Sequence, residues 1–112
     1  MKNFLLTLAF VFILVGSAHA QKIYSVKSQN QADVKVYVVS SQNRADLLVY
    51  KVSSQNKAGK NNGKWYFVNS QNRADKKIYF VNSQNRADLK IYFVKSQNKA
   101  GWRNKSKKHM LY

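Results

Sequence analysis

The feature that most constrains this chain is a 13-residue unit repeated six times in tandem. The copies begin at Ile23, Val36, Val49, Trp65, Ile78 and Ile91, with spacings of 13, 13, 16, 13 and 13 residues. Every copy has a Tyr, a Val two residues later and then the sequence Ser-Gln-Asn-x-Ala. The shared tyrosines are Tyr24, Tyr37, Tyr50, Tyr66, Tyr79 and Tyr92. Self-similarity at a fixed period indicates a fold in which each copy is one supersecondary unit.

The unit predicts one strand followed by one turn. Alternation through the unit places Ala87, Leu89, Ile91 and Phe93 on one face, and Asp88, Lys90, Tyr92 and Val94 on the other. Both faces become apolar in the Ile-Tyr-Phe-Val part, which predicts a strand covered on both sides there. β-Branched and aromatic residues favour strand over helix, and Ser-Gln-Asn favours a turn. We therefore expect an all-β chain.

The six copies divide into two halves of three. Asp33 and Asp46 are followed by Gly59 at the equivalent position, whereas Asp75 and Asp88 are followed by Gly101. Each half closes with Lys-Ala-Gly and a Trp, which is Trp65 after the insert 60–64 and Trp102 directly. Asn62-Gly63 is a strong tight-turn signal. The predicted repeat domain spans 21–102, with halves 23–64 and 65–102.

Residues 1–20 have the pattern of a signal peptide. Lys2 precedes an apolar stretch at 4–15, and Ala18-His19-Ala20 is a small-x-small cleavage pattern. That stretch has 12 residues, fewer than the roughly 20 that a membrane-spanning helix needs. We expect cleavage after Ala20, export to the periplasm or beyond, and no membrane span in the mature chain. The chain has no Cys, so disulfides are excluded.

The mature chain is strongly basic. Without Lys2, 19 of the 20 Lys and Arg remain against four Asp, a net charge of +15. Such a charge favours phosphate-rich or carboxylate-rich partners. Residues 103–112 are predicted to be a basic tail, and its candidate anion-binding residues are Arg103, Lys105, Lys107 and Lys108. A simple solvated tail is the competing interpretation.

Catalysis and metal binding have little support in the sequence. The mature chain has one histidine, His109, and its four acids are Asp residues at one repeat position. Enzyme sites place unlike groups in unlike environments. The four Asp are therefore expected to accept hydrogen bonds in turns or to pair with Lys and Arg. We expect no enzymatic activity, no cofactor and no metal site.

The other repeated residues also have two interpretations each. Tyr interleaved with Lys resembles a stacking platform for single-stranded nucleic acid, but packing in a strand core explains the tyrosines more simply. The Ser-Gln-Asn runs could present hydroxyls and amides to a sugar, but turn chemistry accounts for them. For the architecture, a 13-residue solenoid coil would be very narrow, and cross-β stacking of an amyloid subunit would be opposed by the charge.

A known family shares these motifs. The unit Ser-Gln-(x)-x-Ala-Asp-Leu-Lys-Ile-Tyr-Phe-Val, the junction Gly63-Lys64-Trp65 and the closing Gly-Trp-Arg-Asn-Lys-Ser-Lys-Lys-His resemble the septoil knot domain family, small bacterial proteins of unknown function. The resemblance runs from about Lys22 to the C-terminus. It implies an all-β chain threaded into a seven-crossing torus knot. One departure is the extra Asn in each turn, as at Asn30, which bears on the local turn geometry.

These observations predict a monomeric, exported, non-catalytic domain with a structural or interaction role. The alternative function is binding of polyanions, such as lipopolysaccharide, acidic polysaccharide or extracellular DNA, through the Lys and Arg surface and the tail. A secreted amyloid-type subunit is a further alternative. Residues that recur in all six copies are explained by their role in the fold. A specific activity is therefore expected in the residues that differ between copies.

Overall fold

Each repeat unit folds as one β-strand followed by one 3₁₀ turn. The computed structural model describes residues 21–112, and the predicted signal peptide lies outside them. The repeat strands are β1 (Lys22–Ser25), β2 (Val34–Val38), β3 (Leu47–Lys51), β4 (Lys64–Phe67), β5 (Lys76–Phe80) and β6 (Leu89–Phe93). The turns are η1 (Gln29–Gln31), η2 (Gln42–Arg44), η3 (Gln55–Lys57), η4 (Gln71–Arg73), η5 (Gln84–Arg86) and η6 (Gln97–Lys99). The predicted strand-turn repeat is confirmed.

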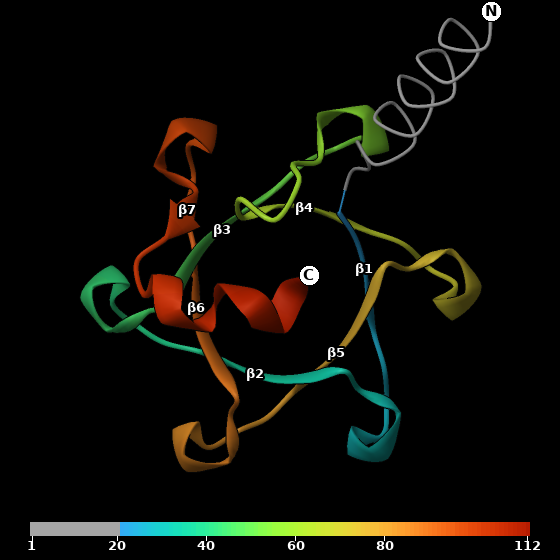
Figure 1. Ribbon diagram of the computed structural model, residues 1–112, viewed down its shortest axis with the longest axis horizontal. Helices are drawn as coiled ribbons and strands as arrows, with labels where there is room; N and C mark the ends of the chain where they lie inside the picture. The colour runs from blue at the N-terminus through green and yellow to red at the C-terminus, as the bar shows by residue number, and fades with distance from the viewer. Residues whose placement is uncertain (1–20) are drawn as a thin grey trace, which may run out of the picture.

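The six repeat strands close into a parallel barrel. They pair in the order β4-β1-β5-β2-β6-β3, and a further pairing of β3 with β4 completes the ring (Figure 1). Strands of the first half therefore alternate with strands of the second half around the whole ring. A short strand, β7 (Gly101–Trp102), pairs antiparallel with the start of β3. This interleaving is not the arrangement of a solenoid, in which consecutive coils are neighbours.

Neighbouring strands are staggered. The start of β5 pairs with β1, as Lys76 opposite Ile23, and its end pairs with β2, as Phe80 opposite Val36. Parallel strands that are staggered in this way tilt against the barrel axis, which lets a small number of strands close around a side-chain core.

Four of the five connections between repeat strands cross a strand of the other half, whereas η3 joins β3 to β4, which are neighbours. The turn η1 joins β1 to β2 and contacts β5, which lies between them, while η2 and η5 contact β6 and β2 in the same way. Figure 1 shows the turns outside the ring of strands. The repeat valines after the strands point away from the barrel interior, yet all six are buried, for example Val26 and Val39. The prediction that both faces are covered is thus confirmed for this part of the unit.

The core is the inside of the barrel. Its central layer has one residue from each strand, and all six are fully buried: Ile23, Val36, Val49, Trp65, Ile78 and Ile91. Val34, Leu47 and Leu89 lie two residues earlier in their strands and extend this cluster. The tyrosines follow the central layer by one residue, so they face outward and are half-buried. The expectation that the tyrosines form the core was therefore wrong, because it chose the wrong one of two apolar faces.

Candidate functional site

The four aspartates each hold a strand of the other half. The backbone N–H of Asp33 donates to the carbonyl of Lys77 at 2.7 Å, and the Asp33 carboxylate accepts from the Lys77 N–H at 2.9 Å. The same two-point contact joins Asp46 to Lys90, Asp75 to Lys22 and Asp88 to Lys35. Each carboxylate thus occupies the place of a backbone carbonyl in a strand ladder. Each Asp contacts the backbone N–H and carbonyl of its lysine partner, and not the charged ammonium group.

The mid-chain insert reproduces this contact without an aspartate. Gly59 N–H donates to the carbonyl of Lys64 at 2.8 Å, and the Lys64 N–H donates to Asn62 Oδ1 at 3.3 Å. A Cβ on residue 59 would overlap the Asn62 side chain. The side chain of Asn62 therefore fills the space that the Asp side chain fills in other copies, which explains why Gly stands at this position.

The two Trp residues that close the halves lie in different environments. Trp65 occupies the central core layer and is fully buried. Trp102 is half-buried, and its Nε1 donates to the Asn61 carbonyl at 3.0 Å. Gly101 begins β7 with a φ of 149°, a conformation that favours glycine. Trp65, Trp102 and Gly101 therefore have structural roles in closing the fold.

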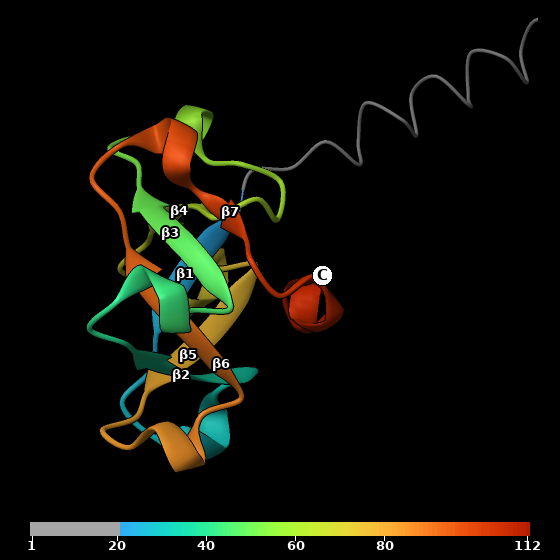
Figure 2. The same cartoon turned by 90° about the vertical axis from the view of Figure 1, so that its left-hand side faces the viewer.

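The C-terminal residues cover the end of the barrel at which the strands begin. They form η7 (Lys105–Leu111), which lies across the ring in Figure 1 and at its edge in Figure 2. Leu111 is 2% exposed and belongs to the core cluster. Gln21 Nε2 donates to the Leu111 carbonyl at 2.9 Å, and Asn61 Nδ2 donates to the Lys108 carbonyl at 3.1 Å. Residues 103–112 are therefore not a solvated tail. The apolar pair Met110-Leu111 was the signal for this docking.

The four candidate anion-binding residues of this segment do not form one patch. Lys107 is half-buried, with its Nζ 3.4 Å from Asp46 Oδ2 and 3.2 Å from the Asp88 carbonyl. Arg103 and Lys105 are exposed, and Lys108 is half-buried. Lys107 is thus engaged by the fold, and Arg103 and Lys105 are the members of the set most accessible to a partner.

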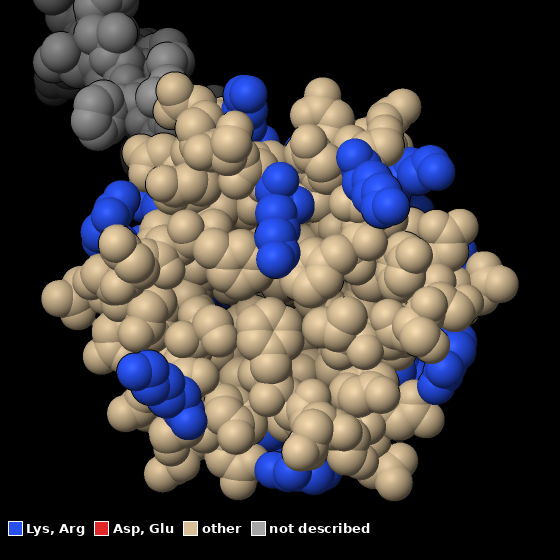
Figure 3. Space-filling view, turned by 180° about the vertical axis from the view of Figure 1, so that it is seen from behind, with Lys and Arg blue, Asp and Glu red and all other residues tan. Residues whose placement is uncertain are grey.

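Basic side chains dominate the charged surface, because the four Asp carboxylates are hydrogen-bonded to backbone groups within the fold. Among residues 21–112, the contact between Lys107 and Asp46 is the one ion pair. Five of the six turns carry an exposed cation at their third position, and the sixth carries Gln31: the cations are Arg44, Lys57, Arg73, Arg86 and Lys99. Figure 3 shows Lys and Arg around the rim of the face opposite η7, with no acidic residue visible. Sequence reasoning placed the anion-binding charge mainly in the tail and missed these turn positions, although the repeat itself displayed them.

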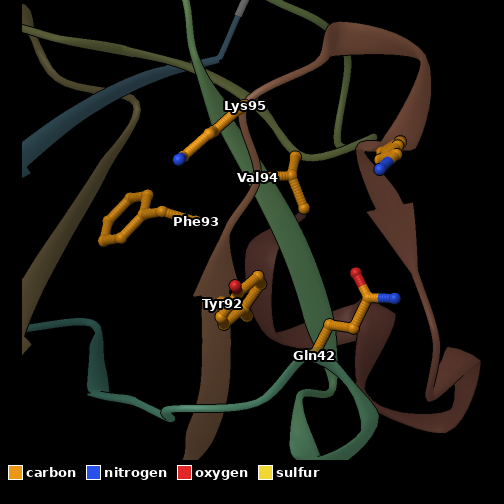
Figure 4. A pocket seen from close by; sticks show the side chains of 6 residues that line it. Gln42, Tyr92, Phe93, Val94 and Lys95 are labelled. Atoms are coloured by element: carbon orange, nitrogen blue, oxygen red, sulfur yellow. The ribbon is translucent and has the colours of Figure 1, made fainter.

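The described part of the chain has one histidine, four Asp and no Cys with which to form a metal or reaction site. It contains no group of three His, Cys, Asp or Glu residues placed to hold a metal ion. His109 is exposed, and its Nδ1 lies 3.0 Å from the Ser106 carbonyl. An open hollow of about 270 Å³ is lined by residues that include Gln42, Tyr92 and Lys95 (Figure 4). In residues 21–112 there is also no helix long and apolar enough to cross a membrane.

Most of the described chain matches a known domain family. The profile of the 7(1) septoil knot domain matches residues 20–103. No curated protein matches the chain. The matched region contains all six repeat units and ends before η7, so the segment that covers the barrel end lies beyond it.

Proposed function

The chain belongs to the septoil knot domain family, and we propose that it is an exported, non-catalytic domain that binds anionic polymers through its Lys and Arg side chains. The family is one of unknown function, so membership does not supply the activity. The anionic partners available to an exported protein are lipopolysaccharide phosphates, acidic polysaccharide and released DNA.

This proposal rests on one observation. The four Asp side chains are hydrogen-bonded within the fold, whereas most of the Lys and Arg side chains are exposed. All four carboxylates accept hydrogen bonds from backbone N–H groups, and Asp46 also pairs with Lys107. Most of the 19 Lys and Arg of the described chain therefore project into solvent without a carboxylate partner. Like charges held on a small rigid body repel one another, and an anionic polymer that neutralises several of them at once is favoured.

Export and the knot are parts of the same proposal. Export is supported by the signal-peptide pattern of residues 1–20. The knot is supported by the family match and by the interleaving of the two halves, in which four of the five connections between repeat strands pass over a strand of the other half. A knotted, disulfide-free domain would resist degradation outside the cell by topology in place of covalent links.

The knot can be tested by closing the chain into a circle. Gln21 contacts the Leu111 carbonyl, so a disulfide between Gln21→Cys and Tyr112→Cys would join the ends of a chain that has no other Cys. The control is the same protein oxidised in denaturant from freshly synthesised, never-folded chain. After full denaturation, a circle closed in the folded state should migrate as a more compact species than the control circle. Equal migration would show that the chain is not knotted.

Polymer binding is tested with variants that the repeat already contains. Gln31 occupies the turn position of Lys57, Arg73 and Lys99, so a triple substitution of these three by Gln removes three charges without a new turn sequence. We expect its affinity for heparin to fall at least tenfold at physiological salt, because each cation that contacts the polymer contributes to counterion release. A triple variant with Asn30, Asn43 and Asn72 changed to Ser is the uncharged control and should bind as the parent does. Unchanged heparin affinity in the charge variant would contradict the proposal.

A further inference from the structure

The end of the barrel at which the strands finish has a lining unlike the rest of the surface. The third residue of each strand motif lies two residues beyond the central core layer and therefore has the same inward orientation. We call these six residues the strand-end face: Ser25, Val38, Lys51, Phe67, Phe80 and Phe93. They differ between copies, whereas the core and turn positions around them are repeated.

The strand-end face is apolar and partly open. Val38 is 41% exposed and Phe80 is 37% exposed, and with Tyr112 they are the exposed large hydrophobic residues of the described chain. Phe67 and Phe93 beside them are half-buried. Because parallel strands finish at one end of a barrel, these side chains gather there. A gathered apolar cluster on a small monomer marks a contact surface more often than single exposed residues do.

Lysines lie in and around this apolar cluster. Lys51 Nζ is 4.5 Å from the centre of the Phe93 ring and 5.5 Å from that of Phe67. Two residues beyond the strand-end face, Lys27 and Lys95 are exposed, and the equivalent residues of the other copies are Ser or Asn. Figure 4 shows Lys95 and Phe93 pointing to the same side of the strand. The Lys51 ammonium group therefore borders two of the aromatic rings, and Lys95 projects toward the same side as Phe93.

No carboxylate opposes these charges. The four Asp of the chain immediately precede β2, β3, β5 and β6, so the parallel order of the strands places all of them at the other end of the barrel. Figure 3, viewed from the side opposite η7, shows a largely uncharged face with basic residues near its rim, a basic side chain that reaches toward the centre, and no acidic residue. The molecule is thus polarised along its barrel axis.

The strand-end face cannot admit a ligand deep into the barrel. The layer directly beneath it, which includes Ile78, Ile91 and Trp65, is fully buried and packed. A single acyl chain would therefore find no tunnel between the strands. A partner must lie against this end, with apolar groups over the aromatic rings and anionic groups over the lysines.

We propose that the strand-end face docks on the surface of a bilayer that contains anionic lipids. Val38 and Phe80 enter the boundary between headgroups and acyl chains, while Lys27, Lys51 and Lys95 contact lipid phosphates. Aromatic and aliphatic side chains ringed by lysine have the chemistry of interfacial membrane contacts, and charge complementarity selects anionic lipid. This inference rests on the proposed function and names the anionic partner of one face of the protein.

The test measures binding of the chain that starts at Gln21 to vesicles of phosphatidylglycerol and phosphatidylcholine, by co-sedimentation. Ser25 shows that Ser is compatible with the strand-end position, so Val38→Ser with Phe80→Ser is the apolar variant. It should weaken vesicle binding roughly tenfold, from the loss of apolar area that enters the interface. Changing Lys27, Lys51 and Lys95 to Ser should weaken binding about fivefold per residue.

A matched control removes three charges elsewhere. Lys35→Gln, Lys77→Gln and Lys90→Gln lie near the starts of β2, β5 and β6, at the other end of the barrel. Charges held more than about 8 Å from the lipid are screened at physiological salt. This control should change vesicle binding much less than the lysine variant does. Circular dichroism and urea unfolding of each variant verify that the fold is retained.

Four outcomes would overturn the inference. The first is equal vesicle binding by the parent and the apolar variant. The second is equal weakening by the two charge variants. The third is binding of monomeric dodecyl phosphate without binding to vesicles. The fourth is a dimer, formed without lipid, that Phe80→Ser dissociates. Heparin binding distinguishes this failure from failure of the proposed function, because the apolar variant should bind heparin as the parent does.

Discussion

The four aspartates look equivalent in the sequence, but we predict that their removal has unequal effects. Asp75 is exposed, and its carboxylate accepts one hydrogen bond, from the Lys22 N–H at 2.8 Å. Asp46 is 6% exposed, and its carboxylate meets the Lys90 N–H at 2.9 Å, Asn104 Nδ2 at 3.2 Å and Lys107 Nζ at 3.4 Å. Asp46 therefore joins the barrel to the C-terminal segment.

The magnitudes follow from these contacts. In Asp75→Ala, water can reach the Lys22 N–H, so the free energy of unfolding should fall by about 1 kcal/mol. In Asp46→Ala, three donors lose their acceptor and the half-buried Lys107 loses its counter-charge. Removing one partner of such a pair costs about 3–5 kcal/mol. Asp46→Asn should fall between the two, since its amide oxygen still accepts from Lys90 while the negative charge is lost.

The assay is urea unfolding followed by circular dichroism, with samples equilibrated from both the folded and the unfolded state so that slow refolding does not distort the midpoint. With a urea dependence of about 1–3 kcal/mol/M, the Asp46→Ala midpoint should lie roughly 1 M below that of Asp75→Ala. Equal midpoints for these two variants would refute the reasoning, because the additional contacts of Asp46 would then contribute nothing to stability.

Three further predictions concern the insert and the C-terminal segment, each measured by urea unfolding. Gly63→Ala should destabilise the fold by at least about 2 kcal/mol, because Gly63 has a φ of 88° and a Cβ there would collide with the Leu48 carbonyl; an effect below 0.5 kcal/mol would count against this. Asn62→Ala should cost about 1 kcal/mol by removing the acceptor for the Lys64 N–H, whereas Asn62→Asp should be tolerated; equal losses would show that the acceptor is unimportant. Leu111→Ala should cost about 2–5 kcal/mol and Lys105→Gln almost nothing, and the reverse order would restore the interpretation of a solvated tail.

Local features of the fold could be predicted from the sequence. The alternation in Ile78-Tyr79-Phe80-Val81 predicted a strand covered on both sides, and Ser83-Gln84-Asn85 predicted a turn, because both depend on residues close together in the chain. Alternation divided the residues into two faces but did not say which face is inside. Ile78 and Tyr79 are both apolar enough for a core, but Ile78 lies inside, and the outward position keeps the polar Tyr79 hydroxyl out of the apolar core.

The order of the strands could not be predicted from residue patterns. Six nearly identical strands can pair with one another in many orders, and nothing local in β1 favours β5 and β4 over β2 as its neighbour. The contacts of Asp33 and Asp88 with the backbone of the other half depend on that order, so they could not be predicted either. Docking of η7 was missed because a basic composition was weighed above the two apolar residues near its end.

The anionic partner stays a prediction, which rests on the excess of Lys and Arg. The sequence analysis expected its contacts on the Lys and Arg surface and in residues 103–112, and did not identify the strand-end residues Val38 and Phe80. These residues come from different copies and meet only because the barrel brings parallel strand ends together. The variable third position of the strand motif was the signal that could have identified them.

The most direct test of the account is the salt dependence of binding to a DNA duplex that has no special sequence. The exposed cations predict that the logarithm of the binding constant falls linearly with the logarithm of salt concentration, with a slope of roughly −3 to −5, corresponding to about three to six neutralised phosphates. The variant with Gln at positions 57, 73 and 99 should show a shallower slope. Binding that does not change between low and physiological salt, or no binding at low salt, would contradict the claim that these side chains bind polyanions.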